Sequence, residues 1–311
     1  MAGKARWIGR WFSHLCSSPI GALAAVAMVA SPQLFSPAGA QEASQLQNHV
    51  LGIGNCPIWH PQSVEVCKHS LEKVVAALAP RIGAGPEHVH LLINEGASAA
   101  ALKRKATELS NQLGAQDRLI IFANVPLGQP GADSTADTPG YVLELWASEK
   151  PENADAAISD GTWISTSAFA ALIHALPAAE VILVLDTNNS HAVSMALLDG
   201  HSLDHEARPE ALISSSGAGQ AANYSADRTI SLFAKHLALA LGETDGTLLD
   251  AMSTAAAGTR QAAIPICASL MENQSQAEGQ PADCAQVPEI HDPDDVLAGT
   301  ALVPLDDSNL N

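Results

Sequence analysis

Basic residues are scarce in this sequence. Lys and Arg number 15 against 33 Asp and Glu, which gives a formal net charge of −18. Because this excess of negative charge repels phosphate groups, binding of nucleic acid or of an anionic membrane surface through phosphate contacts is excluded. The charge is compatible with a basic partner, with divalent cations, or simply with solubility. Hydrophobic residues make up 47% and charged residues 15%, so a packed core is feasible and a wholly disordered chain is excluded.

Long apolar runs are also lacking, because no segment reaches the ~20 apolar residues that a membrane-spanning helix needs. The longest candidate, residues 20–30, follows a segment that carries Lys4, Arg6 and Arg10 but no acid. It precedes the small residues Ala38-Gly39-Ala40, a pattern typical of signal-peptide cleavage. We therefore expect a signal peptide over residues 1–40, export to the periplasm or the extracellular space, and no membrane attachment after cleavage.

The sequence has only five cysteines, and one of them, Cys16, lies in the predicted signal peptide. The remaining four form an even set, which in an exported chain indicates two disulfides. Short loops close with the smallest loss of entropy, which favours Cys56–Cys67 and Cys267–Cys284 among the three possible connectivities. Zinc binding is the alternative, but the sequence has no Cys-x-x-Cys pair.

Phosphate-binding motifs are absent as well, since neither Gly-x-Gly-x-x-Gly nor a Walker run occurs. We predict no cofactor and no metal. His201 and His205 have the spacing of metal ligands on a helix, but Gly200 and the polar residues around it favour a solvated loop.

Apolar segments of two kinds alternate along the chain. Short buried-strand patterns alternate with segments whose apolar residues recur at helical spacing. The strands are expected at 49–54, 88–93, 117–123, 181–185 and 211–215, and the helices at 64–78, 102–113, 167–176, 229–241 and 248–257. This alternation predicts βαβ units, hence an α/β fold with a mostly parallel central sheet and helices on both faces.

Four segments carry a resemblance to a known family. They are Gly-Ile-Gly-Asn at 52–55, the Asp-led apolar strand at 117–122, the apolar strand ending in Asp at 181–186, and residues 212–220 followed by Phe233. In this order and spacing the chain resembles the caspase-like peptidase family, of the bacterial metacaspase or orthocaspase type, over residues 49–258. The resemblance implies a caspase-like sandwich at 41–265, with an insertion loop at about 124–165. We expect residues 266–311 to form an acidic, largely flexible tail.

The chain departs from this family at both catalytic positions. Pro126 stands near the place of the family's general-base histidine, and Asn188 stands where the family has its nucleophilic cysteine. An amide and a pyrrolidine ring can neither attack a carbonyl nor accept a proton. In such relatives the acid that matches Asp186 helps to line a pocket for a basic side chain. Here Asp186 is expected either to line that substrate pocket or only to cap the strand-to-loop turn through backbone N–H groups.

These departures predict a catalytically inactive pseudo-peptidase that binds a peptide or protein partner, basic partners included. Three alternatives stay open. One is an active cysteine-type endopeptidase with an unrecognised dyad, and another is a hydrolase with a different nucleophile. For the latter, Ser190 stands beside His191 but lacks the Gly-x-Ser-x-Gly elbow that would present it. The third is a structural or cation-binding protein of the same fold.

Overall fold

The structure is a computed structural model that describes residues 46–59, 64–128, 141–191, 193–194, 208–274 and 285–304. All of them belong to one compact unit, Ala43–Asn311. The predicted signal peptide at 1–40, the histidine-containing stretch at 199–205 and Cys284 lie outside the described residues.

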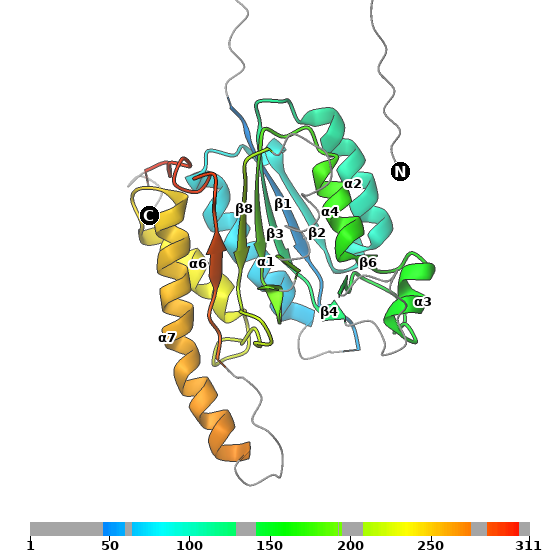
Figure 1. Cartoon of the computed structure of the whole chain (residues 1–311), viewed down its shortest axis with the longest axis vertical. Helices are drawn as coiled ribbons and strands as arrows, with labels where there is room; N and C mark the ends of the chain where they lie inside the picture. The colour runs from blue at the N-terminus through cyan, green and yellow to red at the C-terminus, as the bar shows by residue number, and fades with distance from the viewer. Residues whose placement is uncertain are drawn as a thin grey trace, which may run out of the picture. The chain divides into compact units, whose positions relative to one another are not determined.

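A six-stranded sheet forms the centre of this unit, in the order β2-β1-β3-β7-β8-β9 (Figure 1). The strands are β1 (Asn48–Gly54), β2 (Val89–Ile93), β3 (Arg118–Asn124), β7 (Glu180–Leu185), β8 (Glu210–Ser214) and β9 (Glu289–His291). The first five are parallel, and only β9 runs antiparallel to its neighbour β8. All five parallel strands were predicted from their apolar runs.

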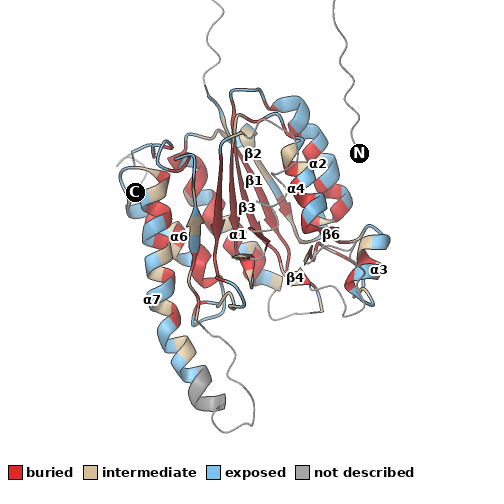
Figure 2. Cartoon of the chain, in the orientation of Figure 1, coloured by how far each residue is buried: buried red, intermediate tan, exposed pale blue. Residues whose placement is uncertain are grey.

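Helices cover both faces of the sheet, and each face has its own apolar core (Figures 1 and 2). One core joins the sheet to α2 (Ala99–Gln112) and α4 (Thr166–His174), and the other joins it to α1 (Val64–Arg81), α6 (Leu232–Glu243) and α7 (Leu248–Gln274). The two-sided burial explains why β3 is buried at every residue and why its sequence does not alternate. The fold is therefore the predicted α/β sandwich, with a mostly parallel sheet and helices on both faces.

The segment after β3 builds a small second sheet. It contains β4 (Leu127–Gly128), β5 (Val142–Leu143) and β6 (Ile164–Ser165), all antiparallel, with the short helix α3 (Ala154–Ser159) between the last two strands. The described part of the predicted insertion at 124–165 is thus an ordered subdomain at the carboxyl end of β3.

Two expectations from the sequence are wrong. The domain does not end at 265, because α7 runs to Gln274, β9 pairs with β8, and Leu297 is fully buried in the core under α7. The described parts of the expected flexible tail, 266–274 and 285–304, are therefore built into the domain. The helix α4, expected at 167–176, begins at Thr166 and is capped by Ser165, whose Oγ accepts a hydrogen bond from Ala168 N at 3.1 Å.

Candidate functional site

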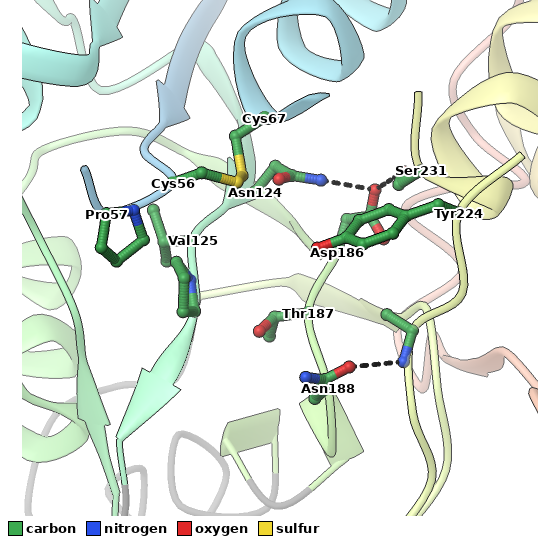
Figure 3. Close-up of a pocket in the computed structure, with 12 residues that line it drawn as sticks. Cys56, Pro57, Cys67, Asn124, Val125, Asp186, Thr187, Asn188, Tyr224 and Ser231 are labelled. Carbon is green, nitrogen blue, oxygen red and sulfur yellow. Dashed lines mark hydrogen bonds between the residues drawn. A yellow bond between two sulfur atoms is a disulfide. The ribbon is translucent and has the colours of Figure 1, made fainter. Parts of the chain in front are cut away.

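The carboxyl ends of β1, β3 and β7 meet at one edge of the sheet, as parallel strands require. A cavity of about 240 Å³ opens there. It is lined by Cys56, Pro57, Cys67, Asn124, Val125, Pro126, Asp186, Thr187, Asn188, Ala222, Tyr224 and Ser231 (Figure 3). The structure thus brings together Pro126, Asp186 and Asn188, which the sequence had singled out separately. No histidine lines this cavity in the described part of the chain.

Asp186 lies at the end of β7 and is 3% exposed. Its Oδ2 accepts hydrogen bonds from Asn124 Nδ2, at 2.8 Å, and from the hydroxyl of Ser231 (Figure 3). Both partners are side chains, one at the end of β3 and the other at the start of α6. The turn-cap interpretation is therefore wrong, because no backbone N–H of the following turn is bonded to this carboxylate among the described residues.

The other carboxylate oxygen of Asp186, Oδ1, is buried and has no hydrogen-bond partner. Burial raises the pKa of Asp186, while the nearby side chains of Ser231, Ser215 and Asn124 act in the opposite direction. Ser231 is also the N-cap of α6, so the carboxylate lies near the positive end of that helix. Asp186, which lines the cavity, thus keeps one buried acceptor without a partner.

Asn188 holds two loops together. Its Oδ1 accepts a hydrogen bond from Ala222 N at 2.7 Å (Figure 3). Its neighbour Asn189 has φ 53°, the left-handed region that Asn tolerates better than most residues. The Asn189 side chain accepts from Gly219 N at 2.8 Å and donates to the hydroxyl of Tyr141 at 2.8 Å. These two amides thus fix the loop after β7 against the loop after β8.

Pro126 stands on the opposite wall of the cavity, at the entrance to β4. Its carbonyl oxygen accepts a hydrogen bond from Glu144 N at 3.0 Å. The pyrrolidine ring has no ionisable group, so Pro126 contributes to the shape of the cavity but supplies no proton acceptor.

Ser190 and His191 do not form a catalytic pair. Ser190 is fully buried, and its Oγ donates to Ser216 O at 3.1 Å and accepts from Ser216 N at 3.0 Å. The imidazole Nδ1 of His191 instead hydrogen-bonds Glu289 on β9. The preceding acid, Asp186, bonds Asn124 and Ser231, so it orients neither residue, and Ser190 does not line the cavity.

The Cys56–Cys67 disulfide is a wall of the cavity, a role that the sequence did not suggest (Figure 3). The bond itself confirms the predicted pairing of these two residues. A Cβ atom at Gly54 would lie 3.2 Å from Cys67 O and 2.9 Å from Leu71 Cδ2. Glycine at this position therefore lets α1 approach the end of β1 closely enough for the disulfide to form. Cys267 is also disulfide-bonded.

Tyr224 and Ser231 are cavity residues that sequence reasoning missed. Ser231 had a local signal, because a Ser immediately before the apolar Leu-Phe-Ala run is a typical N-cap. Tyr224 had none, since it lies in an irregular segment held by a single bridge to Ser231.

No metal-ligand cluster of three or more His, Cys, Asp or Glu residues occurs in the described parts of the chain. None of the described helices is both long and apolar enough to cross a membrane.

Comparisons with known proteins do not identify the chain. No family model matches it, and no curated protein matches it either. Among solved structures, the crystal structure of protein GSU0716 from Geobacter sulfurreducens is similar, with a TM-score of 0.49 at 14% sequence identity. That match covers 79% of this chain and 92% of the other.

Proposed function

We propose that this chain is an exported caspase-like domain protein without peptidase activity, which binds a peptide or protein partner at the cavity beyond β1, β3 and β7. The observation that carries the proposal is the buried, unpartnered Oδ1 of Asp186 in the wall of that cavity. A buried acceptor without a partner costs about 1–3 kcal/mol, and a ligand that donates a hydrogen bond to it removes that cost. Among side chains, Lys and Arg donate most strongly to a carboxylate.

The charges around the cavity support a basic or strongly donating ligand. Asp186 is the only ionisable acid that lines it within the described residues, and no Lys or Arg of those residues competes for the carboxylate. A cation that enters the cavity stabilises the charged form of Asp186, so binding and ionisation of this group favour each other. The net charge of −18 attracts a basic partner at longer range.

Catalysis has less support than binding. The two sulfur atoms in the cavity wall belong to Cys56 and Cys67 and are joined to each other, so neither is a thiolate. Asn188 and Pro126 supply neither a nucleophile nor a base. A cysteine-type endopeptidase in the reduced chain would still need a proton acceptor, which no described cavity residue other than Asp186 provides.

Fluorescence anisotropy with labelled peptides tests this proposal. Peptide sets that differ only in one side chain, Arg, Lys, Gln or Met, are titrated with the wild-type protein and with Asp186→Asn. We expect the Arg and Lys sets to bind the wild type best, and Asp186→Asn to lose about tenfold or more in affinity for them.

Asp155→Asn is the matched control, because Asp155 is exposed in the first turn of α3 and the substitution changes the net charge equally. Equal losses in both variants would show that the peptides respond to net charge alone and would refute binding at the cavity. Binding of the Gln set as tightly as the Arg set would refute the preference for a basic side chain.

A further inference from the structure

Three histidines gather at the amino-terminal end of β1 and β2, the end opposite the candidate cavity. His49 belongs to β1 and His90 to β2, while His88 ends the 3₁₀ turn η1 (Pro86–His88) that leads into β2. The ring centroids of His49 and His88 are 4.3 Å apart, edge to face, and those of His49 and His90 are 6.4 Å apart in a stacked arrangement. We call these three residues the histidine cluster.

Two rings of the histidine cluster, those of His49 and His90, are packed in the neutral form. His49 is only 2% exposed, and neither of its ring nitrogens has a hydrogen-bond partner. The buried Nε2 of His90 has none either. Burial lowers the pKa of both groups, and the neighbouring rings lower the pKa further. A proton added to His49 or to Nε2 of His90 therefore has no uncharged hydrogen-bond acceptor within bonding distance.

Few charged groups face the histidine cluster, so little can balance the charge of added protons. From the turn before β3, Asp117 Oδ2 lies 3.6 Å from His49 Nε2, but this carboxylate already accepts hydrogen bonds from Gly114 N at 2.7 Å and Gln47 N at 3.3 Å. On η1, Glu87 Oε1 lies 3.4 Å from His88 Nε2 and is largely exposed.

The remaining charged neighbours are paired with each other. On α2, the positive charge of Lys105 lowers the pKa of His90, and Lys105 is itself hydrogen-bonded to Glu108. On β3, Arg118 is paired with Glu180 of β7, at 2.6 Å. The cluster thus has one buried carboxylate for three imidazoles.

We propose that the histidine cluster is an acid-operated latch on the edge strand β2. At neutral pH the uncharged rings of His49 and His90 stack at the start of β1 and β2, with the ring of His88 against that of His49. Protonation of two or more rings places like charges within a few ångströms of one another, with only Asp117 to offset them. β2 gives way because it is the end strand of the sheet and pairs with β1 alone, whereas β1 is held between β2 and β3.

The direction of the pH effect follows from the lowered pKa. A histidine whose pKa is lower in the folded than in the unfolded chain contributes stability that is complete above the ordinary value of about 6.5. This stability is lost as the pH falls through and below that value, because the unfolded or opened form takes up protons that the closed form excludes. The latch is therefore closed at pH 7.5 and weakened at pH 5.5.

Hydrogen–deuterium exchange of the purified protein, corrected for the intrinsic pH dependence of exchange, tests the latch. Between pH 7.5 and pH 5.5 we expect the protection of β2 amides to fall by about tenfold, because the opened form takes up protons that the closed form excludes. Amides of β7, in the middle of the sheet, should change much less. A uniform change over β2 and β7, or no change in β2, would overturn the proposal.

Variants locate the effect. His49→Leu removes the most buried ring and should abolish most of the β2 response, whereas His69→Gln, on the exposed face of α1, should leave it unchanged. His90→Gln, at a partly exposed position, is the second test should His49→Leu fail to fold, and should reduce the response as well. Retention of the full response in His90→Gln, or its loss in His69→Gln, would show that protonation elsewhere drives the change. His236 contacts α7 and not β2, so exchange read at β2 separates its titration from that of the cluster.

Discussion

Replacing Asp186 by Asn should stabilise the protein while it weakens the candidate site. The amide oxygen of Asn can take the place of Oδ2 and accept the hydrogen bonds from Asn124 and Ser231. The amide nitrogen then takes the place of Oδ1, which has no partner in the wild type. The substitution thus keeps the two existing hydrogen bonds and removes a buried charge.

The magnitude follows from removal of the buried charge, because the amide nitrogen of Asn has no more of a partner at this place than Oδ1 has. A buried polar atom without a partner costs about 1–3 kcal/mol, and more when it is charged. We therefore expect Asp186→Asn to raise the free energy of unfolding by about 1–3 kcal/mol at pH 7, and Tm by roughly 2–4 °C for each kcal/mol in a domain of this size. Because the folded-state pKa of Asp186 is raised, the wild type has its full stability below the unfolded pKa and loses it as the pH rises through the folded pKa. The advantage of the variant should accordingly vanish in acid and grow toward neutral pH.

Urea unfolding of both proteins between pH 4 and pH 8 measures this difference. Asp250→Asn is the comparison, because Asp250 accepts hydrogen bonds from the backbone and hydroxyl of Thr247 and those bonds lower its pKa. That variant should lose stability at neutral pH, the opposite sign. If Asp186→Asn is instead less stable than the wild type at pH 7, the carboxylate is a net structural asset and the reasoning from its unpaired oxygen is refuted.

Three further predictions concern the same edge of the sheet. The protein should not cleave peptides after Arg, Lys or Asp, with or without Ca²⁺, and efficient turnover by the wild type would contradict this. The double variant Asn188→Cys, Pro126→His should gain only slight activity, since catalytic residues act as a unit. Non-reducing peptide mapping should find Cys56–Cys67, and the double Ser variant should lose roughly 2–3 kcal/mol, as expected for a closed loop of about 11 residues; an unchanged unfolding midpoint would argue against it. Ser190→Ala should lose about 1–3 kcal/mol through the buried hydrogen bonds to Ser216 but leave peptide binding unchanged; loss of a hydrolytic activity would instead indicate a serine nucleophile.

The fold was predictable where burial leaves a regular pattern. Strands such as β3 and β7 are continuous apolar runs, and the helices that cover them repeat at helical spacing. β9 could not be found in this way, because Glu289–His291 contains one apolar residue and is held by its pairing with β8. The length of α7 was missed as well, because the helix was expected to end at 257, directly before Gly258, yet it continues through Pro265 to Gln274.

Only the position of the site, at the carboxyl ends of the strands, was predictable from the sequence. That Asn124, Asp186 and Asn188 would lie at one edge follows from the parallel order of their strands. Their bonding does not follow, because Oδ2 of Asp186 accepts hydrogen bonds from side chains 62 and 45 positions away in sequence. The local turn chemistry that predicts an Asp cap was overridden by these long-range partners.

A difference between the three strand-end residues favours a binding role for this edge. Asn188 and Pro126 both have structural partners: the side chain of one accepts a backbone hydrogen bond, and the carbonyl of the other does the same. Asp186 is different, because one of its oxygens is buried and unpartnered and the residue lines the cavity. Stability of the fold alone would favour Asn at position 186. The presence of Asp there is better explained by an interaction with a ligand, since groups that lower stability concentrate at functional sites. Measured together, the stability and the peptide affinity of Asp186→Asn therefore decide the matter: a gain in the first with a loss in the second is the result that only a binding site gives.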